Sequence, residues 1–252
     1  MEKVLYLQVN AGLGNRIRAL VSGVCWAEKL CRRLVICWSV KSECAAEFSI
    51  LFDGSGFPDW VEIGTTEHEK TTQILSPEDA VKFFKGKDDY EALYIKSHGC
   101  FWSHNDITDK FKWIGVLRNL RPSFEVETLY TEWKSRDLVC RDVIHIRGTD
   151  NEKARRLSPI SAFKSLITEQ DTGKKFTIVS DDLYAVLEMY EMFGERMRIP
   201  ERIRQRNTRE GMIEAAAVFF VLARSSQIFG SANSSFTEIA RDHGFSQLTI
   251  VR

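Results

Sequence analysis

The chain has 252 residues, with 35 lysines and arginines against 35 aspartates and glutamates, and 44% of its residues are hydrophobic. Zero net charge argues against a protein that coats nucleic acid, and the apolar content argues against acidic disorder. No apolar run reaches the roughly 18 residues that a membrane-spanning helix needs. The N-terminus enters a strand-like run at Val4–Leu7 without a signal-peptide pattern, so a cytoplasmic location is expected.

The six cysteines favour buried, reduced thiols. None forms a C-x-x-C pair, which gives no support to a zinc ribbon or a thioredoxin-type site. Four of them fall within the first 44 residues, several in apolar segments where a thiol behaves as a small hydrophobe. A disulfide within those residues is the alternative.

The first 38 residues predict a strand, a helix and a second strand. Val4–Val9 is apolar and β-prone, and Ala11–Asn15 is a glycine turn. An apolar face at helical spacing follows, from Ile17 to Cys31. Leu34–Trp38 is a continuous apolar run, typical of a parallel strand that is covered on both sides. Such a unit predicts an α/β layered domain with right-handed crossovers.

The middle of the chain is less regular. A helix is predicted over Pro77–Phe84, because Ser76 can cap it and proline suits its first position. A strand is predicted at Leu93–Ile95. Leu117–Pro122 marks the boundary between the two halves of the chain, and an amphipathic helix is predicted near Phe124–Trp133.

The second half repeats the alternation of strands and helices. Strands are predicted at 143–146, 176–179, 227–229 and 248–251, with helices starting at 158 and covering 181–192, 211–224 and 234–242. We therefore expect two α/β domains, residues 1–121 and 137–252, joined by a connecting segment at 122–136.

Small, polar or cationic residues follow four of the predicted strands. The carboxyl ends of parallel strands are where α/β proteins bind ligands, and helix N-termini attract anions. Four such turns at one kind of edge indicate a phosphate-bearing ligand. The turns are Gly12–Arg16, Arg147–Asp150, Ser180–Asp182 and Gly230–Ser235.

Two common nucleotide motifs are not matched. Gly12 and Gly14 could open a dinucleotide fingerprint, but Ile17 stands at its third glycine and no carboxylate ends the second strand. The lysine of a P-loop is also missing. A plain tight turn between strand and helix is the remaining alternative.

His145 and Arg147 end a predicted strand with their side chains on one face. An arginine there can fork onto a diphosphate, which a lysine meets only as a point charge. His145 could instead be a core histidine, and Asp150 could cap the next segment or orient Arg147.

Six arginines and no lysine occur between Arg196 and Arg209. Interspersed glutamates favour a solvated face that pairs with itself. Alternatively, Arg206 or Arg209 closes over an anionic ligand from just before a helix.

Taken together, the motifs GLGNR, HIRGTD, SDD and ARSSQIFGSANSSF resemble those of the GDP-fucosyltransferase superfamily, which includes alpha-1,2-, alpha-1,6- (with the bacterial nodulation type) and protein O-fucosyltransferases. The order and spacing match across most of the chain, except for residues 40–115. The resemblance implies a GT-B fold, with two Rossmann-like domains facing across a cleft. It also implies an inverting transfer of fucose from GDP-fucose to a glycan or protein, with no metal or cofactor and no nucleic acid partner.

The resemblance also implies roles for individual residues. Arg147 would bind the β-phosphate of GDP and stabilise the leaving diphosphate, and Asn15 would lie near the phosphates or the acceptor. His145 and Asp150 would shape that site. The remaining donor-binding residues would be Gly12, Gly14, Ser180, Asp181, Asp182, Arg209, Ser234, Ser235 and Phe236.

The chain also departs from the family pattern. Many relatives carry a second arginine after Arg147, where this chain has Gly148. Some carry an aspartate on the helix before the last motif, where Ala216 and Ala217 stand here, with Glu214 one turn earlier. No general base is evident, the candidates being Glu43, Asp53, Asp106 and Asp109. The other functional hypotheses are a catalytically silent nucleotide- or glycan-binding module and a sulfotransferase-like enzyme.

Overall fold

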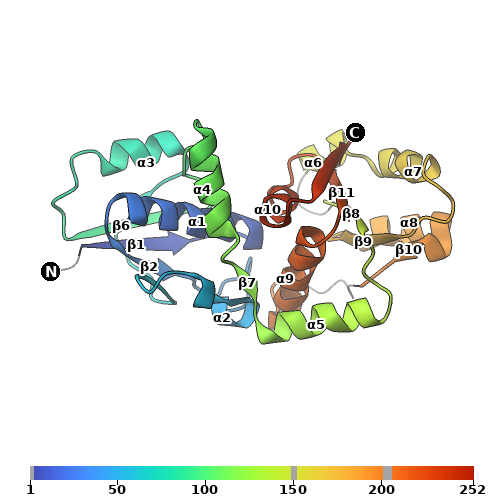
Figure 1. The fold of residues 1–252 in the computed structure, drawn as a ribbon, viewed down its shortest axis with the longest axis horizontal. Helices are drawn as coiled ribbons and strands as arrows, with labels where there is room; N and C mark the ends of the chain where they lie inside the picture. The colour runs from blue at the N-terminus through green and yellow to red at the C-terminus, as the bar shows by residue number, and fades with distance from the viewer. Residues whose placement is uncertain (1–2, 149–151, 201–205) are drawn as a thin grey trace. The chain divides into compact units, whose positions relative to one another are not determined.

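The computed structural model describes residues 3–148, 152–200 and 206–252, and the chain forms two compact units (Figure 1). The first unit comprises Met1–Ser123 with Arg206–Met212, and the second comprises Phe124–Gln205 with Ile213–Arg252. Helix α5 (Phe124–Ser135), expected from the sequence as a connector, belongs to the second unit.

The first unit is built on a five-stranded sheet with the order β4-β2-β1-β6-β5. All neighbouring strands in it are parallel. The strands are β1 (Val4–Val9), β2 (Arg33–Cys37), β4 (Val61–Gly64), β5 (Thr72–Gln73) and β6 (Ala92–Ser97). The other elements are α1 (Leu13–Lys29), α2 (Phe48–Leu51), α3 (Pro77–Phe84), α4 (Ile107–Leu117) and a two-stranded antiparallel pair, β3 (Phe52–Asp53) with β7 (Arg121–Pro122).

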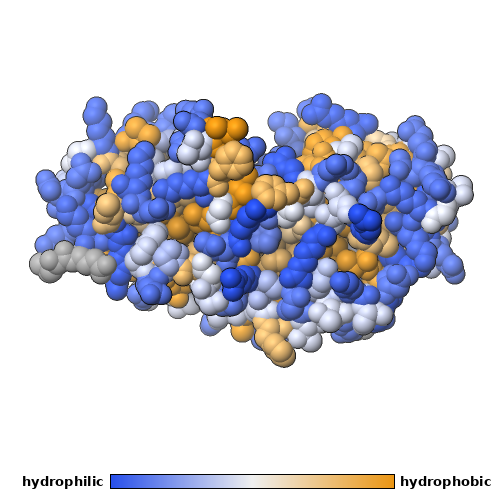
Figure 2. Space-filling view, viewed as in Figure 1, coloured by the Kyte–Doolittle hydropathy of each residue, from blue (hydrophilic) through white to orange (hydrophobic). Residues whose placement is uncertain are grey.

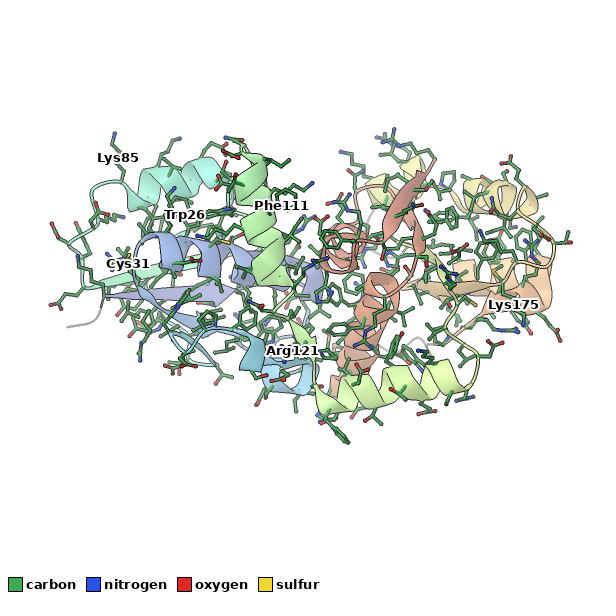
Figure 3. The ribbon with its side chains drawn as sticks, in the orientation of Figure 1. Trp26, Cys31, Lys85, Phe111, Arg121 and Lys175 are labelled. Atoms are coloured by element: carbon green, nitrogen blue, oxygen red, sulfur yellow. The ribbon has the colours of Figure 1, made fainter. Side chains whose placement is uncertain are left out.

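Helix α1 packs closely on the sheet because its buried face includes a glycine. A Cβ atom at Gly23 would lie 2.3 Å from a methyl carbon of Leu7 in β1. Trp26, one turn further along α1, packs on Phe84 of α3 with ring centroids 4.8 Å apart, and Figure 3 shows its side chain between these two helices. The predicted strand, helix and strand at the N-terminus are confirmed.

The start of α3 is confirmed in detail. Ser76 accepts a hydrogen bond from the backbone N–H of Asp79 at 3.1 Å, and the Asp79 carboxylate accepts one from the backbone N–H of Ser76 at 3.1 Å. Pro77 holds the first helical position. This reciprocal capping box satisfies two N–H groups that the helix itself leaves unpaired.

The second unit has its own five-stranded parallel sheet, with the order β10-β9-β8-β11-β12. Its core is apolar and includes Ile144, Phe163, Phe176 and Met189. The strands are β8 (Asp142–Ile146), β9 (Phe176–Ser180), β10 (Met197–Arg198), β11 (Gln227–Ser231) and β12 (Gln247–Val251). The helices besides α5 are α6 (Glu152–Leu157), α7 (Ile160–Thr168), α8 (Leu183–Phe193), α9 (Arg209–Ala223) and α10 (Ser235–Gly244).

These two parallel sheets with their helices confirm the predicted α/β class. The sequence interpretation named no element at β4, at α4 or at β10. In α4, Ile107 and Phe111 are exposed apolar residues one turn apart, which blurs the amphipathic pattern on which such a prediction depends.

Two arginines of the arginine-rich segment, Arg196 and Arg198, bond to groups outside it. Arg196 donates hydrogen bonds to the carbonyl oxygens of Ile167, Asp171 and Lys174. Arg198 donates to the Glu195 carbonyl at 2.7 Å and to the Asp137 carboxylate at 3.3 Å. The partners of these two arginines are mostly backbone carbonyl groups, and Arg202 and Arg204 lie outside the described residues.

All six cysteines lie in the described residues, and each is a free thiol. Hydrophilic residues cover most of the face seen in Figure 2, and hydrophobic side chains form small groups between them. None of the helices in the described parts of the chain is long and apolar enough to cross a membrane.

Candidate functional site

The residues predicted to bind a phosphate group converge at one edge of the sheet in the second unit. Strands β8, β9 and β11 are parallel neighbours, so their carboxyl ends meet there. The register pairs Ile146 of β8 with Ser180 of β9, and His145 of β8 with Gly230 of β11. The residues that directly follow these strands therefore lie side by side.

Arg147 is held from two sides at this edge. One terminal nitrogen of its guanidinium donates to Oδ2 of Asp181 at 2.5 Å. Its backbone N–H donates to the Ser231 hydroxyl at 3.0 Å. The Arg147 side chain is 18% exposed and that of Asp181 is 8% exposed, so the pair lies at the boundary between protein and solvent. A charge-assisted contact of this kind fixes both the position and the orientation of the guanidinium.

Gly148 allows the backbone after β8 to lie close to the turn that follows β9. Its N–H donates to Oδ1 of Asp181 at 2.7 Å. A Cβ atom at this position would lie 2.4 Å from Cβ of Asp182, closer than side-chain atoms pack. This close approach gives a physical reason for glycine where many members of the resembled family have a second arginine.

Asp182 and Ser180 support the turn at the end of β9. Asp182 caps α8 by accepting a hydrogen bond from the Tyr184 N–H at 3.0 Å. Ser180 is buried; its hydroxyl donates to the Ile146 carbonyl at 2.8 Å and accepts from the Asp182 N–H at 3.0 Å. These two residues hold the turn together.

His145 is 5% exposed, and Nδ1 of its ring lies 2.6 Å from the Thr237 hydroxyl. That hydroxyl lies 2.9 Å from Oγ of Ser234, so His145, Thr237 and Ser234 form one hydrogen-bonded chain. The side chain of His145 is therefore held by α10 through this hydroxyl.

The turn from β11 into α10 supplies the serines and the phenylalanine predicted from the sequence. Asn233 takes a left-handed conformation (φ 55°), and Ser234 then caps α10 by accepting from the Thr237 N–H at 3.4 Å. Ser235 and Phe236 are half-buried, and the Phe236 ring centroid lies 5.7 Å from that of His145. Two helix N-termini, those of α8 and α10, thus begin at this edge of the sheet.

The glycine turn of the first unit is built around a different arginine. Gly12 precedes α1 without a side-chain cap, and Gly14 and Asn15 lie in the first turn of the helix. Arg16 is 0% exposed; its Nε donates to the Ala11 carbonyl at 2.8 Å and one terminal nitrogen to the Ser39 carbonyl at 2.6 Å. Its guanidinium carbon lies 5.3 Å from the centre of the Trp38 ring. Burial lowers the pKa of Arg16 from its ordinary value.

The predicted site residues thus divide between the units. Arg147 and the donor-binding residues from β8, β9, β11 and α10 belong to the second unit. Gly12, Gly14, Asn15 and Arg209 belong to the first, and Arg209 is exposed at the first residue of α9. Asp150 lies outside the described residues.

Two contacts at the edge were not predicted. Ser231 and Thr237 hold Arg147 and His145 respectively. Ser231 lies in the polar turn Gly230–Ser235 that the sequence indicated, so its place near the site was predictable but its contact with Arg147 was not. Thr237 gave none, because its contact depends on how α10 packs against β8. Among the residues that the structure describes, no group of three or more His, Cys, Asp or Glu side chains is arranged to hold a metal ion.

No protein-family model matches this sequence, and no curated protein sequence matches it significantly. Solved structures do share its fold. The chain superposes on NodZ alpha-1,6-fucosyltransferase co-crystallized with GDP with a TM-score of 0.68 and 16% identity, over 96% of this chain and 92% of that one. Another structure of NodZ is that of the enzyme from Bradyrhizobium.

Two further structures match over nearly the whole chain. A mutant of Arabidopsis thaliana FUT1 in complex with GDP gives a TM-score of 0.66 and 16% identity, over 99% of this chain and 70% of that one. POFUT1 in complex with GDP gives a TM-score of 0.68 and 12% identity, over 99% and 98% of the two chains. The chain therefore has the fold of these fucosyltransferases.

Proposed function

We propose that this protein is a glycosyltransferase that transfers fucose from GDP-fucose to a glycan or protein acceptor. The observation that carries the proposal is Arg147, held at the carboxyl edge of a parallel sheet by Asp181 and Ser231. It is supported by the fold that the chain shares with three fucosyltransferases whose structures contain GDP. In the GT-B arrangement that we propose, the second unit binds the donor and the first unit contributes to acceptor recognition.

In the proposed reaction an acceptor hydroxyl attacks the anomeric carbon of the donor from the side opposite the diphosphate. The bond from that carbon to the phosphate oxygen breaks, and GDP leaves with the electron pair. The anomeric configuration is inverted, and the acceptor loses its proton to a base that remains to be assigned. The reaction as proposed uses neither a metal ion nor a cofactor.

The departing diphosphate gains negative charge, and the groups at the site suit that charge. The guanidinium of Arg147 can donate two parallel hydrogen bonds to phosphate oxygens. The N-termini of α8 and α10 add oriented N–H groups near the same edge. Donors that are already in place stabilise the leaving group without reorganising, and this is usually the largest catalytic contribution. His145, Ser180, Asp182, Ser234, Ser235 and Phe236 would shape the donor site, and Asn15 would act from the first unit.

A ligand panel tests the proposal. GDP, UDP, ADP and 3′-phosphoadenosine 5′-phosphate are added separately, and the melting temperature is measured. GDP at about 100 times its dissociation constant should stabilise the protein by about 2.7 kcal/mol, whereas the others should give smaller shifts. A shift with the 3′-phosphoadenosine ligand alone would instead indicate a sulfotransferase-like enzyme.

Arg147→Ala should abolish both the GDP shift and donor turnover. The matched control is Arg136→Ala, which removes an exposed arginine paired with Glu132 on α5 of the same unit, and it should leave both unchanged. A GDP shift without transfer or donor hydrolysis under any acceptor would mean a catalytically silent binding module. No shift with any nucleotide or nucleotide sugar would refute the proposal.

A further inference from the structure

We propose that Asp181 is a positioning residue, which holds Arg147 ready for the leaving diphosphate and does not itself bind the nucleotide. This inference rests on the proposed function and assigns Asp181 a different role from the donor-binding one expected from the sequence.

Both carboxylate oxygens of Asp181 face the protein. Oδ2 accepts from the Arg147 guanidinium at 2.5 Å, and Oδ1 accepts from the Gly148 N–H at 2.7 Å. One side chain thus fixes the guanidinium and the backbone of the following residue together. A guanidinium has five N–H donors in a planar fork, so a carboxylate can hold one edge while another edge meets a phosphate.

The burial of the two side chains agrees with a supporting role for Asp181 and a ligand-contacting role for Arg147. The Asp181 side chain is 8% exposed and that of Arg147 is 18% exposed, so the carboxylate lies deeper than the cation that it holds. A carboxylate in direct contact with a diphosphate would also repel it, since like charges at short range cost free energy. Asp181 therefore acts on the ligand through Arg147.

The local backbone keeps Asp181 in place from the other side. Ser180 is anchored to the Ile146 carbonyl and supports the N–H of Asp182, and a side chain larger than that of Gly148 would clash with Asp182. The turn after β9 is thus locked to the turn after β8. The position of Arg147 follows from this locked pair of turns.

Asp181→Asn tests the inference through steady-state kinetics. The amide keeps the shape of the side chain but loses the charge and one acceptor, so the guanidinium is no longer held. A misplaced catalytic group costs about 10- to 100-fold in rate, and we expect this loss in kcat. The KM for the donor should change by less than about 3-fold, because ground-state binding depends less on the exact placement.

The matched control is Asp137→Asn. Asp137 also pairs with an arginine, Arg198, at 3.3 Å, but its side chain is 72% exposed. Asparagine also tolerates the left-handed backbone of this position (φ 56°). Its kcat and KM should match those of the wild type. If both aspartate variants leave kcat unchanged, Asp181 is not a positioning residue.

Chemical rescue separates positioning from a structural role. Added guanidinium ion should restore part of the turnover of Arg147→Ala, because Asp181 and the Gly148 N–H still form a seat for it. Rescue should be lost in the double variant Arg147→Ala with Asp181→Asn. Equal rescue in both backgrounds would overturn the inference, as would tighter GDP binding by Asp181→Asn, which would make Asp181 an internal competitor for the anion site.

A measurement without nucleotide keeps this inference distinct from the proposed function. The melting temperatures of the wild type, Arg147→Ala, Asp181→Asn and the double variant form a cycle. A paired Asp181 predicts that the double variant loses less than the sum of the single losses. If the losses add, the inference fails whatever the enzyme does; if they couple but no nucleotide binds or turns over, the proposed function fails and the pairing stands.

Discussion

Each unit carries an arginine in the segment that follows a strand of its parallel sheet: Arg16 lies in the first turn of α1, after β1, and Arg147 directly follows β8. Arg16 is fully buried and bonded to two backbone carbonyls, whereas Arg147 is partly exposed and bonded to a carboxylate. The two carbonyls hold two of the three guanidinium nitrogens of Arg16 inside the fold, and its other terminal nitrogen is buried without a hydrogen-bond partner among the described residues. The carboxylate of Asp181 instead supports the guanidinium of Arg147 near the surface, where it can meet a ligand. The two arginines therefore differ in burial and in the groups that accept their hydrogen bonds.

The same conservative exchange at both positions tests this contrast most directly. In Arg147→Lys the ammonium can keep the pairing with Asp181, so the unfolding free energy should fall by less than about 1 kcal/mol. The planar fork is lost, however, and turnover of the donor should fall about 100-fold. Denaturant titration and initial rates measure the two effects.

In Arg16→Lys we expect the opposite result, a large loss of stability with little change in GDP affinity. A lysine cannot reach two carbonyls with a planar fork, and a buried ammonium loses more hydration than a guanidinium, so the unfolding free energy should fall by about 2–3 kcal/mol. The folded fraction should keep its GDP affinity. If Arg16→Lys instead abolishes GDP binding at full folding, the distinction between the two arginines is wrong.

Gly148→Ala adds one methyl group to the second-unit site. Because the new Cβ would meet the Asp182 side chain at 2.4 Å, the two turns must separate. We expect a loss of about 1–3 kcal/mol in unfolding free energy and weaker GDP binding. Gly99→Ala is the control, since nothing lies within 4 Å of a Cβ there, and it should be close to neutral. Wild-type GDP affinity in Gly148→Ala would show that the site does not depend on this close approach.

Thr237→Val removes the hydroxyl that holds His145 while keeping the shape of the side chain. The imidazole and Ser234 each lose a buried partner, and we expect a loss of about 1–2 kcal/mol in unfolding free energy. The His145 ring resonances in NMR should also shift, because the ring loses the hydroxyl that lies 2.6 Å from Nδ1. Unchanged ring resonances would contradict this contact.

The last prediction concerns Cys25, which is buried in α1 of the first unit. Burial raises the pKa of its thiol from 9.0 to about 12. Between these two values the unfolded chain releases the proton and the folded chain keeps it, so stability falls as the pH rises through this range. Cys25→Ala should show a shallower fall in denaturation midpoint than the wild type between pH 9 and 12. Identical slopes would contradict the raised pKa.

Much of the fold could be predicted because local patterns and tertiary packing agree. The apolar runs of β1, β2, β8 and β9 and the Ser76 cap of α3 are short-range signals that the structure keeps. Strand β4 has only four residues and α4 exposes apolar side chains, so neither shows a clear periodic spacing of apolar residues along the sequence.

The sequence predicted which residues contribute to the candidate site, but it did not predict which of them contact one another. Polar residues at the strand ends indicated Arg147, Asp181 and Ser234, because parallel strands bring their carboxyl ends together. The partners of these residues depend on register and on helix packing, which place Asp181 against Arg147 and Thr237 against His145. The burial of Arg16 against the carbonyls of Ala11 and Ser39 likewise depends on tertiary packing.

The pairing of Arg147 with Asp181 has a consequence for how an anion would be captured. Two opposite charges in contact cancel each other at distances greater than their separation, so the pair projects almost no field into solution. The pair itself would therefore add little to the long-range steering of an approaching diphosphate, and its share of the ionic-strength dependence of association should be small. Arg147 would contribute to recognition mainly at hydrogen-bonding distance, where the shape of the ligand matters more than its net charge.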